Sequence, residues 1–107
     1  MSQVDEILTA VAYPIRRDML RRLAQRPRRA GELARGFAVS RPAICKHARI
    51  LERAGLIRAA KSGRTRMYKL APDAGAALRG AASQLEELSA FWDVALDAFK
   101  RIAEESR

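Results

Sequence analysis

The apolar residues of this 107-residue chain change their spacing at Gly55, and that change restricts the fold more than any other feature. Before Gly55 they recur at intervals of three and four, the spacing of amphipathic helices. We therefore expect helices over residues 3–12, 14–26, 30–36 and 41–54. After Gly55, apolar and polar residues alternate on both sides of Gly63, which is typical of a β-hairpin. The sequence predicts a mainly α-helical fold with a small β-hairpin at 56–61 and 65–70. From Pro72 the chain is expected to return to helix, first as a loose stretch rich in Ala and Gly and then as a regular helix from about Ser83.

The third and fourth predicted helices are separated by a short turn and form a helix-turn-helix. Gly36 is a natural stop for the third helix, because glycine enters the left-handed conformation without strain. Ser40 is a strong N-cap candidate for the fourth helix, and Pro42 is tolerated in its first turn. A basic hairpin behind this pair is the wing of a winged helix-turn-helix. We expect one such domain over 1–107, with a DNA-binding core at about 14–71 and flanking dimerisation helices at about 3–12 and 83–105.

Charge is divided very unevenly along the chain. Residues 14–69 carry seventeen basic and three acidic side chains, a balance of +14. The remaining residues carry four basic and nine acidic side chains, a balance of −5, so the whole chain has a net charge of +9. Such an excess indicates a polyanionic partner, either a nucleic acid or an anionic membrane surface. Its concentration in one block favours nucleic acid, and no apolar run is long enough to span a membrane.

The fourth predicted helix is suited to the major groove of double-stranded DNA. On a helical wheel Ile44, Ala48 and Leu51 share the side that faces the core, and most of the basic residues lie opposite. The N-terminal end of such a helix meets base edges, and the tip of a wing suits backbone phosphate or the minor groove. The residues expected to contact DNA are Ser40, Arg41, Pro42, Cys45, Lys46, His47, Arg49 and Arg53 in the helix and Lys61, Arg64 and Arg66 in the wing.

The last predicted helix carries an apolar seam with alternating steps of three and four residues. This is the spacing of the a and d positions of a coiled coil, and it predicts contact with a second copy of the chain. The expected interface residues are Leu85, Leu88, Trp92, Ala95, Phe99 and Ile102, joined by Val4, Ile7 and Val11 of the first helix. The alternative is a ligand pocket between the subunits, lined by Phe91, Trp92, Leu96 and Phe99.

Four segments, in this order, resemble the winged-helix repressors of the ArsR/SmtB type. They are Tyr-Pro-Ile-Arg-Arg-Asp-Met-Leu-Arg-Arg-Leu (13–23), Gly-Glu-Leu-Ala (31–34), Ser-Arg-Pro-Ala-Ile-Cys-Lys-His-Ala-Arg-Ile-Leu (40–51) and Ala-Gly-Leu-Ile (54–57). The resemblance covers about residues 4–70. It implies a homodimer that binds operator DNA and usually represses its own operon, with the third segment as the recognition helix.

The chain departs from the metal-sensing members of that family. Those members carry Cys-x-Cys in the third helix, or His and acidic ligands in the last one, and this chain has neither pattern. We therefore expect no metal site and no cofactor. The family also has Ser at the position of Cys45 and Leu at that of Ala48, so Phe37 is expected to fill the space that Ala48 leaves.

Cys45 and His47 do not form a catalytic pair. Residues two apart on a helix point about 200° away from each other, so the thiol and the imidazole cannot converge. The sequence also lacks a phosphate-binding glycine loop and a paired-carboxylate motif, and no enzyme is expected. A redox-sensing thiol at Cys45 is the alternative to a small groove-facing side chain. With one cysteine and no possible internal disulfide, the chain suits the cytoplasm.

These features together predict a sequence-specific, double-stranded-DNA-binding transcriptional regulator. The expected form is a homodimeric repressor that acts on its own operon at a pseudo-palindromic operator. The sequence does not indicate whether it responds to a small-molecule inducer. The alternative function is an architectural protein that coats DNA or RNA without sequence preference. The mixed outward face of the fourth helix, which includes Pro42 and Cys45, favours groove reading over the uniform Lys/Arg face of a coating protein.

Overall fold

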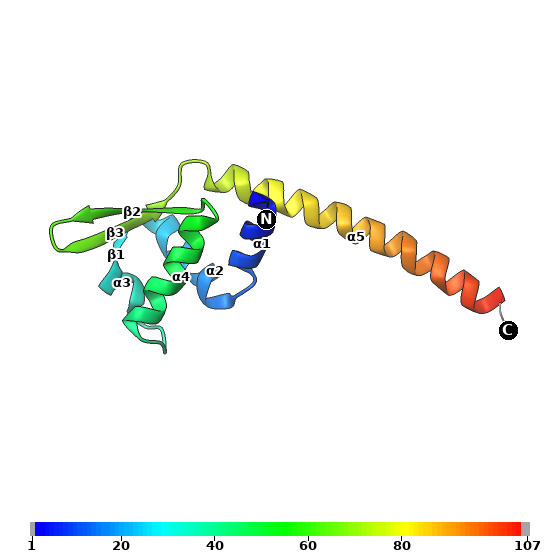
Figure 1. The fold of residues 1–107 in the computed structure, drawn as a ribbon, viewed down its shortest axis with the longest axis horizontal. Helices are drawn as coiled ribbons and strands as arrows, with labels where there is room; N and C mark the ends of the chain where they lie inside the picture. The colour runs from blue at the N-terminus through cyan, green and yellow to red at the C-terminus, as the bar shows by residue number, and fades with distance from the viewer. Residues whose placement is uncertain (1, 106–107) are drawn as a thin grey trace.

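The computed structural model of the protein is mainly α-helical (Figure 1). It describes residues 2–105, so residues 1, 106 and 107 of the expected domain lie outside the described range. The elements in chain order are α1 (Gln3–Val11), α2 (Pro14–Gln25), β1 (Arg28–Arg29), α3 (Ala30–Ala34), α4 (Arg41–Arg53), β2 (Ile57–Ser62), β3 (Thr65–Leu70) and α5 (Ala74–Glu105). The prediction of a mainly α-helical fold with a small hairpin is confirmed.

The ends of α4 are set by the residues that the sequence singled out. The Ser40 hydroxyl accepts a hydrogen bond from the Ala43 backbone N–H at 3.3 Å, which satisfies one of the free donors of the first turn. Pro42 lies in that first turn, where a missing N–H has no cost. Gly55 has a φ of +77°, a left-handed conformation that turns the chain from α4 into β2.

The three strands form an antiparallel sheet in the order β1-β3-β2. Tyr68 of β3 faces Ala59 of β2 on one side and Arg28 of β1 on the other. The hairpin was predicted, but β1 was not. It has only two residues, both arginine, and it is a strand because it pairs with β3 rather than because of any apolar alternation.

The core lies between the helices and the inner face of the sheet. Ile44, Ala48 and Leu51 of α4 are fully buried, as the helical wheel predicts. They pack in one cluster with Leu33 of α3 and Tyr68 of β3. Phe37 packs on the same cluster and is half-buried.

The last helix is more regular at its start than the sequence predicts. A return to helix from Pro72 was expected, loose up to about residue 83, and α5 is one continuous helix of 32 residues from Ala74. Ala74 and Ala81 are buried, and this first part of α5 packs against α1. Packing of small side chains thus outweighs the low helix propensity of Gly75 and Gly80.

Beyond Ala81 the helix leaves the body of the protein. Its distal part and the β2–β3 hairpin project from opposite ends of the molecule, whose longest dimension is 69 Å (Figure 1). Almost every described residue after Ala81 is exposed. Within the described range, no helix combines the length and the apolar character needed to cross a membrane.

Candidate nucleic-acid interface

The outward face of α4 carries most of the predicted DNA-contacting residues. Ser40, Arg41 and Pro42 are exposed at its N-terminal end, and Lys46 and Arg49 follow on the same side of the helix. No ion pair or hydrogen bond is recorded for the Arg41, Lys46 or Arg49 side chains among the described residues. Three cations on one exposed helix face therefore remain available to phosphate and to guanine O6 and N7.

Arg53 lies apart from this group. It is exposed, but its side chain lines a hollow of about 250 Å³ between α1 and α4, together with Glu6, Thr9 and Ile50. Its position at the C-terminal end of α4 places it next to α1 rather than beside the N-terminal cations.

The wing places its three predicted residues at the free end of the hairpin. Lys61 and Arg66 form a cross-strand pair, and Arg64 lies in the turn next to Gly63, whose φ is +67°. All three side chains are exposed. Side chains an even number of residues apart in a strand lie on the same face of the sheet. Lys61 therefore lies on the same face as buried Ile57, and Arg66 on the same face as buried Tyr68, which is the face that packs on the helices.

Cys45 and His47 are both half-buried. The His47 Nδ1 atom is out of contact with solvent and has no hydrogen-bond partner among the described residues. Burial lowers the pKa of His47, and the nearby charges of Arg16 and Lys46 lower it further, so the imidazole is neutral at pH 7. A neutral, partly buried His47 fits a role in packing better than one in phosphate contact.

The sequence did not reveal the role of Arg22 in α2. Its guanidinium donates to the backbone carbonyl of Leu33 at 3.1 Å and also to that of Arg35, and it lies over the Phe37 ring at 4.0 Å. These contacts fix the end of α3 and the turn that leads to α4. No local pattern identifies such a residue, because its partners lie 11 to 15 positions later in the chain.

Arg16 and Arg17 also donate hydrogen bonds to backbone carbonyls of their own chain, at the C-terminal end of α1. Arg16 is almost fully buried, and its guanidinium donates to the carbonyls of Ala10 at 2.7 Å and Thr9 at 3.1 Å. Arg17 donates to the carbonyl of Val11 at 2.7 Å. Cations at the C-terminal end of a helix stabilise it, so part of the +14 block serves the fold and not a partner.

The predicted dimer residues fall into two groups. On α5, Leu85, Leu88, Trp92, Phe99 and Ile102 are exposed, with 72% of Phe99 accessible, and Ala95 is half-buried. On α1, Val4 and Val11 are half-buried, but Ile7 is only 2% exposed. The prediction for Ile7 is therefore corrected: it packs in the core of its own chain.

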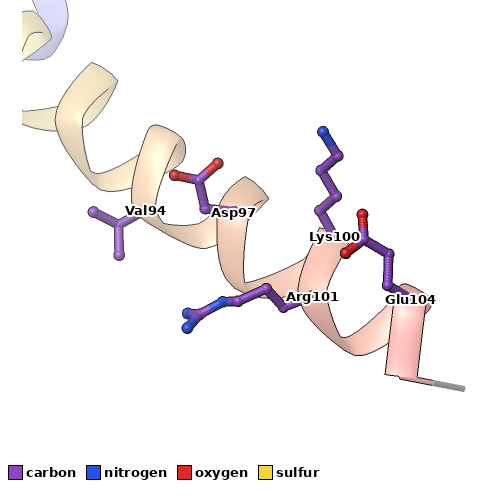
Figure 2. A pocket seen from close by; sticks show the side chains of 5 residues that line it. All are labelled: Val94, Asp97, Lys100, Arg101 and Glu104. Carbon is purple, nitrogen blue, oxygen red and sulfur yellow. The ribbon is translucent and has the colours of Figure 1, made fainter.

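The distal part of α5 also bears a shallow hollow. It has a volume of about 460 Å³ and is lined only by α5 side chains, namely Val94, Asp97, Lys100, Arg101 and Glu104. Figure 2 shows these side chains pointing in different directions from a single helix. With no second element facing them, they do not form a ligand pocket. Within the described residues no group of three His, Cys, Asp or Glu side chains could hold a metal ion.

Comparison with known proteins decides the family. The sequence profile described as "Bacterial regulatory protein, arsR family" matches residues 13–59, from the start of α2 into β2. The HTH-type transcriptional regulator Rv2034 of Mycobacterium tuberculosis is 38% identical over 98 residues, which cover 92% of this chain and 86% of that protein. The crystal structure of the ArsR family transcriptional regulator RHA00566 matches with a TM-score of 0.72 at 34% identity, over 81% of this chain and 96% of that one. This chain belongs to the ArsR family.

The ArsR-family chain is accordingly a transcriptional regulator with a helix-turn-helix DNA-binding domain. Its fold also matches a domain from Mycobacterium bovis, described as a homodimeric winged helix-turn-helix DNA-binding domain. That match has a TM-score of 0.65 at 24% identity, over 80% of this chain and 82% of that one. The predictions of an ArsR/SmtB-type regulator and of a winged helix-turn-helix are confirmed.

Proposed function

We propose that this ArsR-family regulator is a homodimeric repressor that reads a pseudo-palindromic operator, placing α4 of each subunit in the major groove and each wing on the flanking backbone. The observation that carries the proposal is the exposed outward face of α4, where the Arg41, Lys46 and Arg49 side chains make no ion pair or hydrogen bond with any described residue. Lys61 and Arg64 at the wing extend the same cationic surface. DNA binding of this kind would take place in the cytoplasm, and no catalysis is proposed.

The dimer proposal rests on the distal part of α5. Its exposed apolar side chains include Trp92 and Phe99, which a monomer would leave in water on a stretch of helix that projects away from the rest of the described chain. The steps of three and four between seam residues fit a second helix packed alongside. Val4 and Val11 of α1 are the proposed additional contacts, now without Ile7. The partner for this surface is a second copy of the chain.

Repression is proposed because a dimer seated on an operator occupies the DNA that transcription requires. The alternative is an architectural protein that coats nucleic acid without sequence preference. The two differ in how binding responds to single side chains. A base-reading Arg41 would affect the cognate site most, whereas a wing phosphate contact would affect all sequences about equally.

The test is a mobility-shift titration against the DNA upstream of the chain's own gene and against random duplex. Binding that depends on six to ten phosphate contacts should weaken by about 10³ to 10⁵ between roughly 50 and 200 mM salt. Arg41→Ala should cost about 1–3 kcal/mol mainly on the cognate site, and Arg64→Ala should weaken both duplexes about equally. Arg79→Ala on α5 is the charge-matched control and should change neither.

Two results would reject the proposal. Affinity that does not change with salt would exclude DNA as the partner. A ratio of cognate to random affinity near one in the wild type, unchanged by Arg41→Ala, would favour the coating protein.

A further inference from the structure

Glu52 is the only acidic residue of α4, and it lies on the side of the helix that faces the wing. Its Oε1 atom is 3.9 Å from the Arg66 guanidinium of β3. That oxygen is out of contact with solvent and accepts no hydrogen bond from any described residue. A buried carboxylate oxygen without a donor is unfavourable. The Glu52 side chain as a whole is 29% exposed, and Arg66 is the described cation within 4.0 Å of its carboxylate.

Arg66 also interacts with Tyr68. Tyr68 lies two residues further along β3 on the same face and is almost fully buried. Interaction with the Tyr68 hydroxyl, and then with Glu52, raises the pKa of Arg66. Cys45 of α4 lies near both Arg66 and Tyr68. The guanidinium thus sits where the recognition helix meets the wing.

The ion pair between Glu52 and Arg66 is loose enough for Arg66 to change partner. A separation of 3.9 Å exceeds hydrogen-bond distance, and 57% of the Arg66 side chain is exposed to solvent. A DNA phosphate could offer Arg66 two short charge-assisted hydrogen bonds in place of one distant carboxylate. We propose that Glu52 is an internal counter-ion of Arg66 that operator phosphate displaces, so that Glu52 weakens binding to all DNA and sets the contribution of the wing.

This inference rests on the proposed function. It predicts how much Arg66 contributes to the salt dependence of DNA binding. When an ordinary cationic side chain meets phosphate, the DNA releases condensed cations, and each contact adds about 0.9 to the slope of log affinity against log salt. When Arg66 changes partner, it neutralises a phosphate, but the freed Glu52 carboxylate stays beside the DNA. The net charge that the pair brings to the DNA is then close to zero, and almost no condensed cation is released. Arg66 should therefore add almost nothing to the slope while Glu52 is present.

A double-mutant cycle on random duplex tests this balance, with the salt slope as the readout. Glu52→Gln should steepen the slope by about 0.9 and raise affinity at low salt by about two- to fivefold. Arg66→Ala should leave the slope of the wild type almost unchanged, but should reduce the slope of the Glu52→Gln variant by about 0.9. A merely structural role for Glu52 would lower affinity and would not make the Arg66 effect conditional.

Asp18→Asn is the matched control, because it removes one negative charge from an exposed pair with Arg21 on α2. It should leave the slope unchanged. The inference is overturned if Glu52→Gln and Asp18→Asn behave alike, or if Arg66→Ala lowers the slope equally in both backgrounds. If Glu52→Gln does not fold, Glu52→Asp replaces it: the shorter side chain should give an intermediate slope, and a wild-type slope overturns the inference. Failure of the proposed function is distinct, since the wild type would then show no salt-dependent DNA binding.

Discussion

Replacing Arg22 with alanine tests whether one side chain of α2 fixes the turn before the recognition helix. Its guanidinium makes two hydrogen bonds to the carbonyls of Leu33 and Arg35 and lies over the Phe37 ring. Hydrogen bonds from a charged donor contribute about 1.5–3 kcal/mol each, and an exposed cation–π contact about 0.5–1 kcal/mol. The carbonyls are partly accessible and regain water when Arg22 is lost. We therefore expect a net loss of about 2–3 kcal/mol in the free energy of unfolding.

A loss of that size is easily measured. For a domain of about this length it lowers Tm by roughly 10–15 °C, in thermal scans at one protein concentration so that dimerisation does not confound the comparison. Arg21→Ala is the matched control, with the same change in charge at the next position. Arg21 contacts only Asp18 among the described residues, and 69% of its side chain is exposed, so its loss should cost less than about 0.5 kcal/mol.

The reasoning also predicts an effect on DNA binding. At temperatures where Arg22→Ala is still folded, operator affinity should fall because the orientation of α4 relative to α2 is less fixed. Arg22→Lys keeps the charge but loses the planar fork, so it should lie between wild type and alanine. If Arg22→Ala and Arg21→Ala differ by less than about 0.5 kcal/mol in unfolding free energy, the turn is not held by Arg22.

Three further outcomes are expected. Trp92→Glu with Phe99→Glu should give a monomer in sedimentation and weak operator binding, because unpaired charge in the interface costs several kcal/mol; a folded dimer with normal affinity would refute the seam. The pKa of His47 is lowered below its ordinary value of 6.5, so protonation favours the unfolded chain and stability should fall as the pH drops below about 6.5. His47→Gln should flatten that part of the pH profile, and an unchanged profile would contradict it. Micromolar zinc, cadmium or arsenite should not release operator DNA, and metal-driven release in a gel shift would show that a site was missed.

The sequence was most informative where local signals and burial agree. Ser40, Pro42 and Gly55 mark the ends of α4 because each acts on the backbone within three residues of its own position. The three core-facing residues of α4 follow from the helical period alone. The outward residues follow in the same way, so the candidate interface is predictable from the sequence.

The features that were missed depend on contacts between distant segments. β1 exists because Arg28 and Arg29 pair with β3, some forty residues later. The first turns of α5 are regular rather than loose because Ala74 and Ala81 pack against α1, which propensity does not reveal. Ile7 was placed in the dimer interface because periodicity identifies an apolar face but not what covers it.

The unbroken course of α5 has a geometrical consequence. One rigid rod, roughly 48 Å long at 1.5 Å per residue, carries both the alanines that anchor it to the body and the seam proposed for the partner. The distance and the twist between the two recognition helices of a dimer would then depend on the number of α5 residues between the buried alanines and the seam. Inserting one residue between Ala81 and Leu85 would rotate the seam by about 100° relative to the body, while leaving every side chain of both surfaces intact. The half-site spacing that such a dimer recognises would therefore depend on the register of α5. A change of length between Ala81 and Leu85 would alter that spacing without changing any residue that contacts DNA.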